Sequence, residues 1–179
     1  ALILGRWGYS NAYHDAERIL RGHLLPSQLR DTSFIVDPPN PRGEDGLRDV
    51  ADRHLGAFGF PAPYGHQPLD VERVSFALDV VGGAVGSLCE AYRDATRLDS
   101  AGHWVNLLFD HETDTIRVES IYTHPALTIT VRQPGPLFVR LPPWVPLDRV
   151  SVQGLAGPPR FTRGGLFVAL PPLGQPIAL

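Results

Sequence analysis

The residues best suited to chemistry lie in two stretches that follow one another in the chain. A loop rich in aromatic residues carries Tyr64, His66 and Gln67, and a glycine-rich segment then begins at Asp79 and includes Gly82 and Gly83. An aromatic ring beside hydrogen-bonding groups suits a sugar, whose faces are apolar and whose rim carries hydroxyls. A loop anchored only by the packing of its aromatic residues explains the same pattern equally well.

The glycine-rich segment is predicted to begin a helix. Asp79 can accept hydrogen bonds from the first free backbone N–H groups and so act as an N-cap. Each glycine costs about 1 kcal/mol relative to alanine in a helix, so these glycines need a reason. Either they allow a neighbouring element to pack closely, or they leave N–H groups open to a ligand. Apolar residues at helical spacing predict the buried stripe of this helix: Val81, Val85, Leu88, Tyr92 and Ala95.

Asp79 is also the candidate catalytic residue, because it is the acidic side chain that can be placed at this helix start. Its role as a plain N-cap is the simpler interpretation. The seven histidines have no ligand spacing, so we predict neither a metal site nor a cofactor. The chain contains no nucleophile elbow, no nucleotide-binding loop and no H-E-x-x-H motif.

Composition excludes several classes of partner. A formal net charge of −3 without a block of like charges argues against binding to nucleic acid or to an acidic membrane surface. No apolar run approaches the length of about 20 residues that a membrane span needs. We therefore expect a soluble chain of unknown location, and a removed leader stays possible because the sequence does not begin with methionine.

Residues 1–98 read as mainly helical. A helix is predicted from Asn11 to Pro26, then a proline-rich loop from Asp31 to Gly46 and a short helix from about Leu47 to Leu55. The buried stripe expected for the first of these helices consists of Ala12, Ala16, Ile19, Leu20 and His23. Since the opening helix fragment at residues 1–5 is too short to cover the other helices, we expect further helices to pack here.

Residues 103–179 read as β-structure, joined to the helices through Asp99–Gly102. Strands of alternating character separated by turn signals predict an antiparallel β-sandwich, and the turn at 110–114 predicts a hairpin between the first two strands. The strands are expected at 103–109, 115–120, 127–132, 137–141, 149–153, 165–170 and 177–179. The fold class is therefore α+β. Trp104 and Trp144 offer an alternative sugar surface on the sandwich, although a tryptophan beside such strands is more often packed.

The order of these elements, with His103–Phe109 and the segment Leu137–Trp144, resembles the C-terminal part of the β-L-arabinofuranosidase-like glycoside hydrolases. That family joins an (α/α) helical toroid to β-sandwich domains. The resemblance implies that residues 1–98 are the last helices of a toroid and that 103–179 are its sandwich. It also implies a carbohydrate ligand, and the rest of the toroid as a partner, either as a separate chain or as a missing segment.

The chain departs from the family at the residues that perform catalysis there. The resemblance implies a cysteine pair at positions occupied by Val80 and Val81, and neither valine can attack carbon or bind metal. Cys89 lies two turns further on, where we expect a buried structural thiol. Two functions therefore stay open: a fragment or subunit of a glycoside hydrolase that is inactive alone, or a non-catalytic carbohydrate-binding or scaffold protein of that family.

Overall fold

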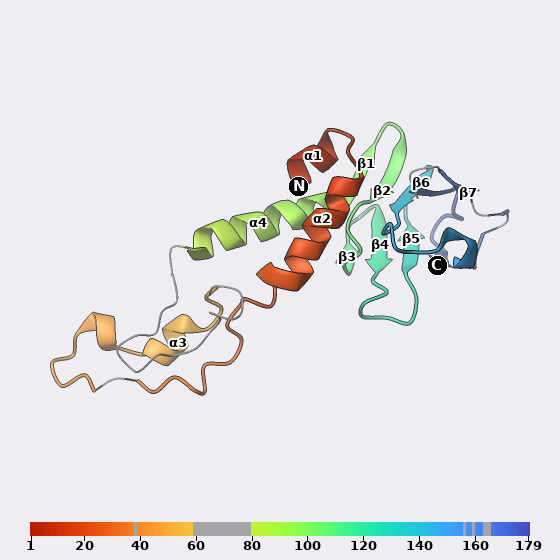
Figure 1. Cartoon of the computed structure of the whole chain (residues 1–179). Coiled ribbons are helices and arrows are strands. Elements are labelled where there is room, and N and C mark those ends of the chain that lie inside the picture. The colour runs from red at the N-terminus through yellow and green to blue at the C-terminus, as the bar shows by residue number, and fades with distance from the viewer. Residues whose placement is uncertain (38, 59–79, 156, 159, 163–165) are drawn as a thin grey trace. The chain divides into compact units, whose positions relative to one another are not determined.

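The computed structural model describes residues 1–37, 39–58, 80–155, 157–158, 160–162 and 166–179. Within them the chain forms two compact units, each of which is described by itself. Unit 1 contains Ala1–Glu17 and Cys89–Leu179, and unit 2 contains Arg18–Leu88. The presence of both helices and two sheets, visible in Figure 1, confirms the α+β class. No helix in the described ranges is long and apolar enough to cross a membrane.

Unit 1 is built on two sheets. The five-stranded sheet has the order β1-β2-β6-β8-β7, and the four-stranded sheet has the order β3-β4-β5-β9. Neighbouring strands are antiparallel except β2 and β6, which pair in parallel, so the expectation of a purely antiparallel sandwich is wrong at this pair. The strands are β1 (Thr96–Asp99), β2 (Gly102–Val105), β3 (His111–Glu112), β4 (Ile116–Glu119), β5 (Thr128–Val131), β6 (Leu137–Arg140), β7 (Arg160–Phe161), β8 (Leu166–Ala169) and β9 (Pro176–Ala178).

The two sheets share one hydrophobic core. It takes buried side chains from both sheets, among them Val139 and Phe167 of one sheet and Ile129 and Ile177 of the other, each 0% exposed. Along β5 the predicted alternation is confirmed, because Ile129 and Val131 are buried while Thr128 and Thr130 are partly exposed. The sheets therefore face each other across the core in the manner of a β-sandwich.

The predicted hairpin between residues 103–109 and 115–120 is wrong. Strand β2 ends at Val105 and pairs with β1 and β6, while β4 pairs with β3 and β5. The end of β2 has a local cause: the backbone N–H of Asn106 donates to the carbonyl of Ala95 (2.9 Å), and its side-chain amide donates to that of Asp94 (3.0 Å). Asn106 thus satisfies carbonyls at the end of a helix, and the chain leaves the sheet there.

Two further boundaries differ from the predictions. Residues Thr96–Asp99 form β1 directly after a helix that ends at Ala95, and Asp99 pairs with Gly102, so the expected connection is the turn of a β1–β2 hairpin. Residues 149–153 do not form a strand. The chain there consists of a 3₁₀ turn at Leu147–Arg149 and an isolated bridge from Gln153 to Ala178.

Helices α1 (Leu2–Arg6) and α2 (Asn11–Ile19) precede the sheets in the chain. The ring of Tyr13 packs so closely on α1 that a Cβ added at Gly5 would lie 2.6 Å from two of its ring carbons. The predicted stripe is partly wrong: Ala12, Ala16 and Leu20 are buried, whereas Ile19 is exposed, as is His23. Glu17 is buried in their place because its carboxylate has partners inside the unit.

The stripe predicted for helix α4 (Val80–Ala95) is only partly right: of its members, Ala95 is buried and Leu88 is half-buried, but two others are exposed. Ala84, Ala91 and Ala95 are buried, while Val85 is 47% and Tyr92 62% exposed. The buried residues lie at i, i+7 and i+11, which is one helical stripe rotated away from the larger side chains. Small alanines allow close packing, so the larger residues are left on the outer side. The side chain of Val81 lies outside the described residues.

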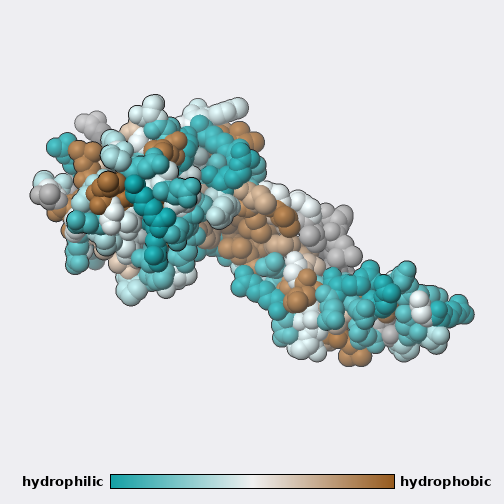
Figure 2. All heavy atoms as spheres, turned by 180° about the vertical axis from the view of Figure 1, so that it is seen from behind, coloured by the Kyte–Doolittle hydropathy of each residue, from teal (hydrophilic) through white to brown (hydrophobic). Residues whose placement is uncertain are grey.

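Unit 2 has few regular elements. Besides the end of α2 and the first turns of α4, they are the π-helical turn Leu20–Leu24, the 3₁₀ turn Asp45–Leu47 and helix α3 (Val50–His54). The short helix expected at 47–55 is thus confirmed in its central part. The carboxylate of Asp37 accepts from the N–H of Ala51 (2.9 Å), which satisfies a free donor in the first turn of α3. Apolar residues reach the surface at several places, as Figure 2 shows for one face of the molecule.

Candidate functional site

Most of the predicted site residues lie outside the described residues. These are Tyr64, His66, Gln67 and Asp79. Gly82 and Gly83 lie in the first turns of α4 and are exposed, and no described atom lies within 4 Å of a Cβ added at either. The described structure thus gives no close neighbour that would explain these two glycines by packing.

Two expectations about single residues are wrong. Cys89 is exposed rather than buried, because the inward face of α4 is the alanine stripe. Trp144 is 62% exposed and is not a core residue. Trp104 is packed as expected: its ring stacks on Phe138 with centroids 4.3 Å apart, and its indole N–H donates to Asp99 (3.0 Å).

A pocket of about 440 Å³ in unit 1 gathers the side chains most suited to binding a ligand. We call it the Tyr92 pocket. It lies where the C-terminal part of α4 meets β3, the outer strand of the four-stranded sheet, and an aromatic ring, two imidazoles and several charged groups line it. Its lining residues are Tyr92, Asp110, His111, Glu112, Arg117, Val118, Glu119 and His124.

One wall of the pocket is an aromatic pair. The rings of Tyr92 and His111 have centroids 4.5 Å apart and are inclined at 59°. Tyr92 is 62% exposed, whereas His111 is 7% exposed and its Nδ1 has no hydrogen-bond partner in the described part of the chain. Burial lowers the pKa of His111, so its imidazole is neutral at pH 7. A neutral imidazole can donate one hydrogen bond and accept one.

The charged groups of the pocket are held in place by partners. The carboxylate of Glu112 accepts from Arg132, and that of Glu119 accepts from Arg117 at 2.7 Å. The hydrogen bond from Arg132 lowers the pKa of Glu112. Both pairs are open to solvent, so they engage the two carboxylates without adding much stability.

Asp110 anchors the other side of the pocket. Its carboxylate accepts from the backbone N–H of Ser120 (2.6 Å) and from the hydroxyl of Thr123 (2.7 Å), and Nε2 of His124 lies 3.5 Å from it. These contacts hold the loop that follows β4 against Asp110, which directly precedes β3. No group of three or more histidine, cysteine or acidic residues among the described residues has the geometry of a metal site.

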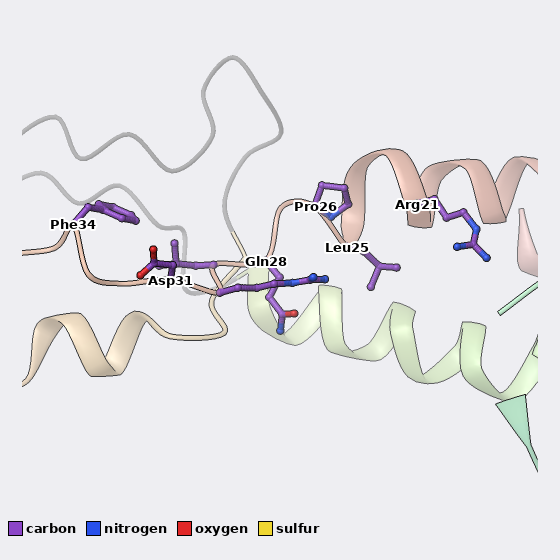
Figure 3. A pocket seen from close by; sticks show the side chains of 8 residues that line it. Arg21, Leu25, Pro26, Gln28, Asp31 and Phe34 are labelled. Carbon is purple, nitrogen blue, oxygen red and sulfur yellow. The ribbon is translucent and has the colours of Figure 1, made fainter. Parts of the chain in front are cut away.

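A second cavity, of about 640 Å³, lies in unit 2. Figure 3 shows that its side chains are strung along one stretch of chain, with Arg21 and Phe34 at opposite ends, rather than converging on a point. It is therefore an elongated groove lined by both apolar and polar side chains. Its lining residues are Arg21, Leu25, Pro26, Gln28, Leu29, Arg30, Asp31 and Phe34.

The sequence contained part of the signal for the Tyr92 pocket. A hairpin that turns at 113–115 places Glu112 opposite Arg117 and His111 opposite Val118, as the β3–β4 register shows. The predicted turn at 110–114 is wrong, because His111 and Glu112 lie in β3 and the strand predicted at 103–109 does not pair with β4. Tyr92 and His111 come from different elements, a helix and a strand. The hydrophobic periodicity of the sequence describes each element separately, so it cannot predict a contact between the two.

No protein-family model, curated protein or solved structure matches this chain.

Proposed function

We propose that this chain is the C-terminal part of a carbohydrate-active protein of the glycoside-hydrolase type, in which toroid helices precede the sandwich. In this proposal, the chain binds a sugar in the Tyr92 pocket. The observation that supports this best is the exposed ring of Tyr92 beside the buried imidazole of His111. A sugar has apolar C–H faces and a hydroxyl rim, so a ring next to oriented polar groups complements both parts of it.

Binding is a better match to this pocket than bond cleavage. A glycosidase needs a carboxylic acid that still carries its proton near neutral pH, which requires a raised pKa. The pKa of Glu112 is lowered instead, by Arg132. Glu112 is therefore unsuited to act as the general acid, which agrees with the second candidate function, a non-catalytic carbohydrate-binding protein. In the hydrolase alternative, cleavage is assigned to groups outside this pocket, and Asp79 remains the candidate.

A titration monitored by NMR tests the proposal. The ¹⁵N-labelled full chain is titrated with neutral arabinose- and glucose-based oligosaccharides, and the amide signals of Tyr92 and His111 are followed. Tyr92→Ala is expected to weaken binding about tenfold, which corresponds to the loss of one aromatic contact. The same titrations include an assay for released reducing sugar, which we expect to stay at background.

Tyr9→Ala is the matched control, because Tyr9 is a similarly exposed tyrosine (66%) that does not line the pocket. It should leave the affinity unchanged. Equal losses in the two variants, or no shift at the pocket with any sugar, would contradict the proposal.

A further inference from the structure

We propose that Asp45–Gly46 is a site of spontaneous aspartate isomerisation, and that Arg53 restrains the reaction in the folded chain. This inference is independent of sugar binding. Asp45 is the one aspartate of the sequence that is followed by glycine. Its side chain is 89% exposed, and no described atom lies within 4 Å of a Cβ added at Gly46. The backbone nitrogen of Gly46 therefore has no side chain beside it that would hinder its approach to the carboxyl group.

The reaction is a cyclisation followed by a hydrolysis. The backbone nitrogen of Gly46 attacks the side-chain carboxyl carbon of Asp45 and forms a C–N bond, while the N–H proton and the carboxyl hydroxyl leave together as water. Water then opens the five-membered succinimide by breaking one of its two C–N bonds. Breaking the newly formed bond restores aspartate. Breaking the original peptide bond gives isoaspartate, in which the main chain runs through the side-chain carbons.

The fold holds the peptide group that has to turn. The nitrogen of Gly46 and the carbonyl of Asp45 lie in one rigid plane, so bringing the nitrogen to the side chain also rotates the carbonyl. That carbonyl accepts hydrogen bonds from Nη1 of Arg53 (2.8 Å) and from the N–H of Arg48 (3.4 Å). The ion pair between the Asp45 carboxylate and Arg48 (3.5 Å) is open to solvent and restrains the side chain little.

Arg53 is the stronger restraint because it connects two elements. Its Nη1 donates to the carbonyl of Arg48 (3.4 Å) as well as to that of Asp45, so α3 holds the 3₁₀ turn through this side chain. Isomerisation must break the bond to Asp45. Since the turn is only three residues long and none of them is buried, its local opening should be frequent enough for the reaction to proceed slowly.

Asp99 shows the opposite arrangement and serves as an internal reference. It is followed by a small residue, Ser100, but its side chain is only 35% exposed. Its carboxylate accepts from the backbone N–H of Ala101 (2.9 Å) and from the indole N–H of Trp104 (3.0 Å). Because these donors hold the carboxyl group in the β1–β2 turn, we expect Asp99 to resist isomerisation.

Ageing of the full chain tests the proposal. The protein is incubated at neutral pH and physiological temperature and then digested, and electron-based fragmentation in the mass spectrometer distinguishes isoaspartate from aspartate. Isoaspartate should accumulate at Asp45 and stay at background at Asp99. Asp45→Glu should abolish the product, because a glutamate would have to close a larger ring. Gly46→Ala should slow its formation severalfold, because the methyl group lies beside the attacking nitrogen.

Arg53→Ala tests the restraint. It removes the hydrogen bond to the Asp45 carbonyl and should speed isomerisation severalfold in the folded chain. Arg42→Ala is the matched control, because Arg42 is 85% exposed and lies 3.9 Å from Glu44 in the same unit. It should leave the rate unchanged. In guanidinium chloride, where the turn is absent, the parent chain and Arg53→Ala should react at the same rate.

The site and its restraint can fail separately. Absence of isoaspartate at Asp45, or equal amounts at Asp45 and Asp99, would overturn the modification site. If Arg53→Ala and Arg42→Ala age alike, the restraint by Arg53 is wrong. If Arg53→Ala keeps its faster rate in guanidinium chloride, the effect does not act through the fold, and the restraint is wrong as well.

Discussion

Glu17 in α2 and Arg140 in β6 form an ion pair in which each side chain is only 5% exposed. The carboxylate of Glu17 also accepts from the backbone N–H of Leu108 (3.2 Å), and Nε of Arg140 donates to the carbonyl of Asn106 (2.5 Å). The pair therefore connects the helix before the sheets to the centre of the five-stranded sheet and to the segment that follows β2. All of these groups belong to unit 1.

Breaking this pair should destabilise the chain strongly. Glu17→Gln leaves the guanidinium of Arg140 buried opposite a neutral amide, and such changes typically cost about 3–5 kcal/mol. Urea denaturation followed by circular dichroism measures the loss. The exposed acid Glu44 is the control, and Glu44→Gln should change the free energy of unfolding by less than about 0.5 kcal/mol. Equal effects of the two changes would show that the buried pair contributes nothing particular.

Two glycine-to-alanine changes should have opposite effects. At Gly5 the new methyl group would lie 2.6 Å from the Tyr13 ring, and the overpacking should cost about 1–3 kcal/mol. At Gly86 no described atom lies within 4 Å, so the higher helix propensity of alanine should stabilise α4 by about 1 kcal/mol. The melting temperatures of both variants test this: that of Gly5→Ala should fall and that of Gly86→Ala should rise. A destabilised Gly86→Ala would mean that a neighbour does pack on that glycine.

Acid should weaken the fold through His111. Burial lowers its pKa below the ordinary value of 6.5, so the unfolded chain binds more protons than the folded chain around that pH. This contribution to stability is complete above pH 6.5 and is lost as the pH falls through the lowered pKa. Melting temperatures between pH 7.5 and 5 should therefore fall less steeply for His111→Gln than for the parent chain. Parallel curves for the two proteins would exclude His111 as the source.

Cys89 should react readily in the folded state. Its thiol is exposed on α4, so a thiol reagent should label it without denaturant. Cys89→Ser should change the free energy of unfolding by less than about 0.5 kcal/mol, because no packed side chain is lost. Mass spectrometry gives the labelling rate, and the rate in urea is the reference. If labelling occurs only after unfolding, Cys89 is buried, as the sequence predicted.

Local patterns predicted which residues form strands better than they predicted which strands pair. Alternation placed Ile129 and Val131 correctly in the core, because the two faces of a strand follow directly from its pleat. Pairing depends on packing between distant segments, so β2 was assigned to the strand that follows it rather than to β1 and β6. The face of α4 was misjudged for a related reason. Hydrophobic size favoured Val85 and Tyr92 as buried residues, while the packing selected the small alanines.

The candidate site was the hardest part to predict. The pairing of Glu112 with Arg117 was missed because the sequence placed Glu112 in a turn, and Tyr92 approaches His111 only because α4 and β3 meet in space. The predicted aromatic loop and Asp79 lie outside the described residues, so the hypothesis that they bind sugar at the start of α4 stays a prediction.

The parallel pairing of β2 with β6 also bears on how the chain folds. These two neighbours are separated in sequence by the segment that contains β3, β4 and β5, which belong to the other sheet. A parallel pair cannot be closed by a tight turn. The chain must therefore pass through β3, β4 and β5 before β6 can pair with β2 at the centre of the five-stranded sheet. The folding rate should accordingly be limited by a contact of high sequence separation, and substitutions at this seam should slow refolding more than substitutions in the local β1–β2 hairpin.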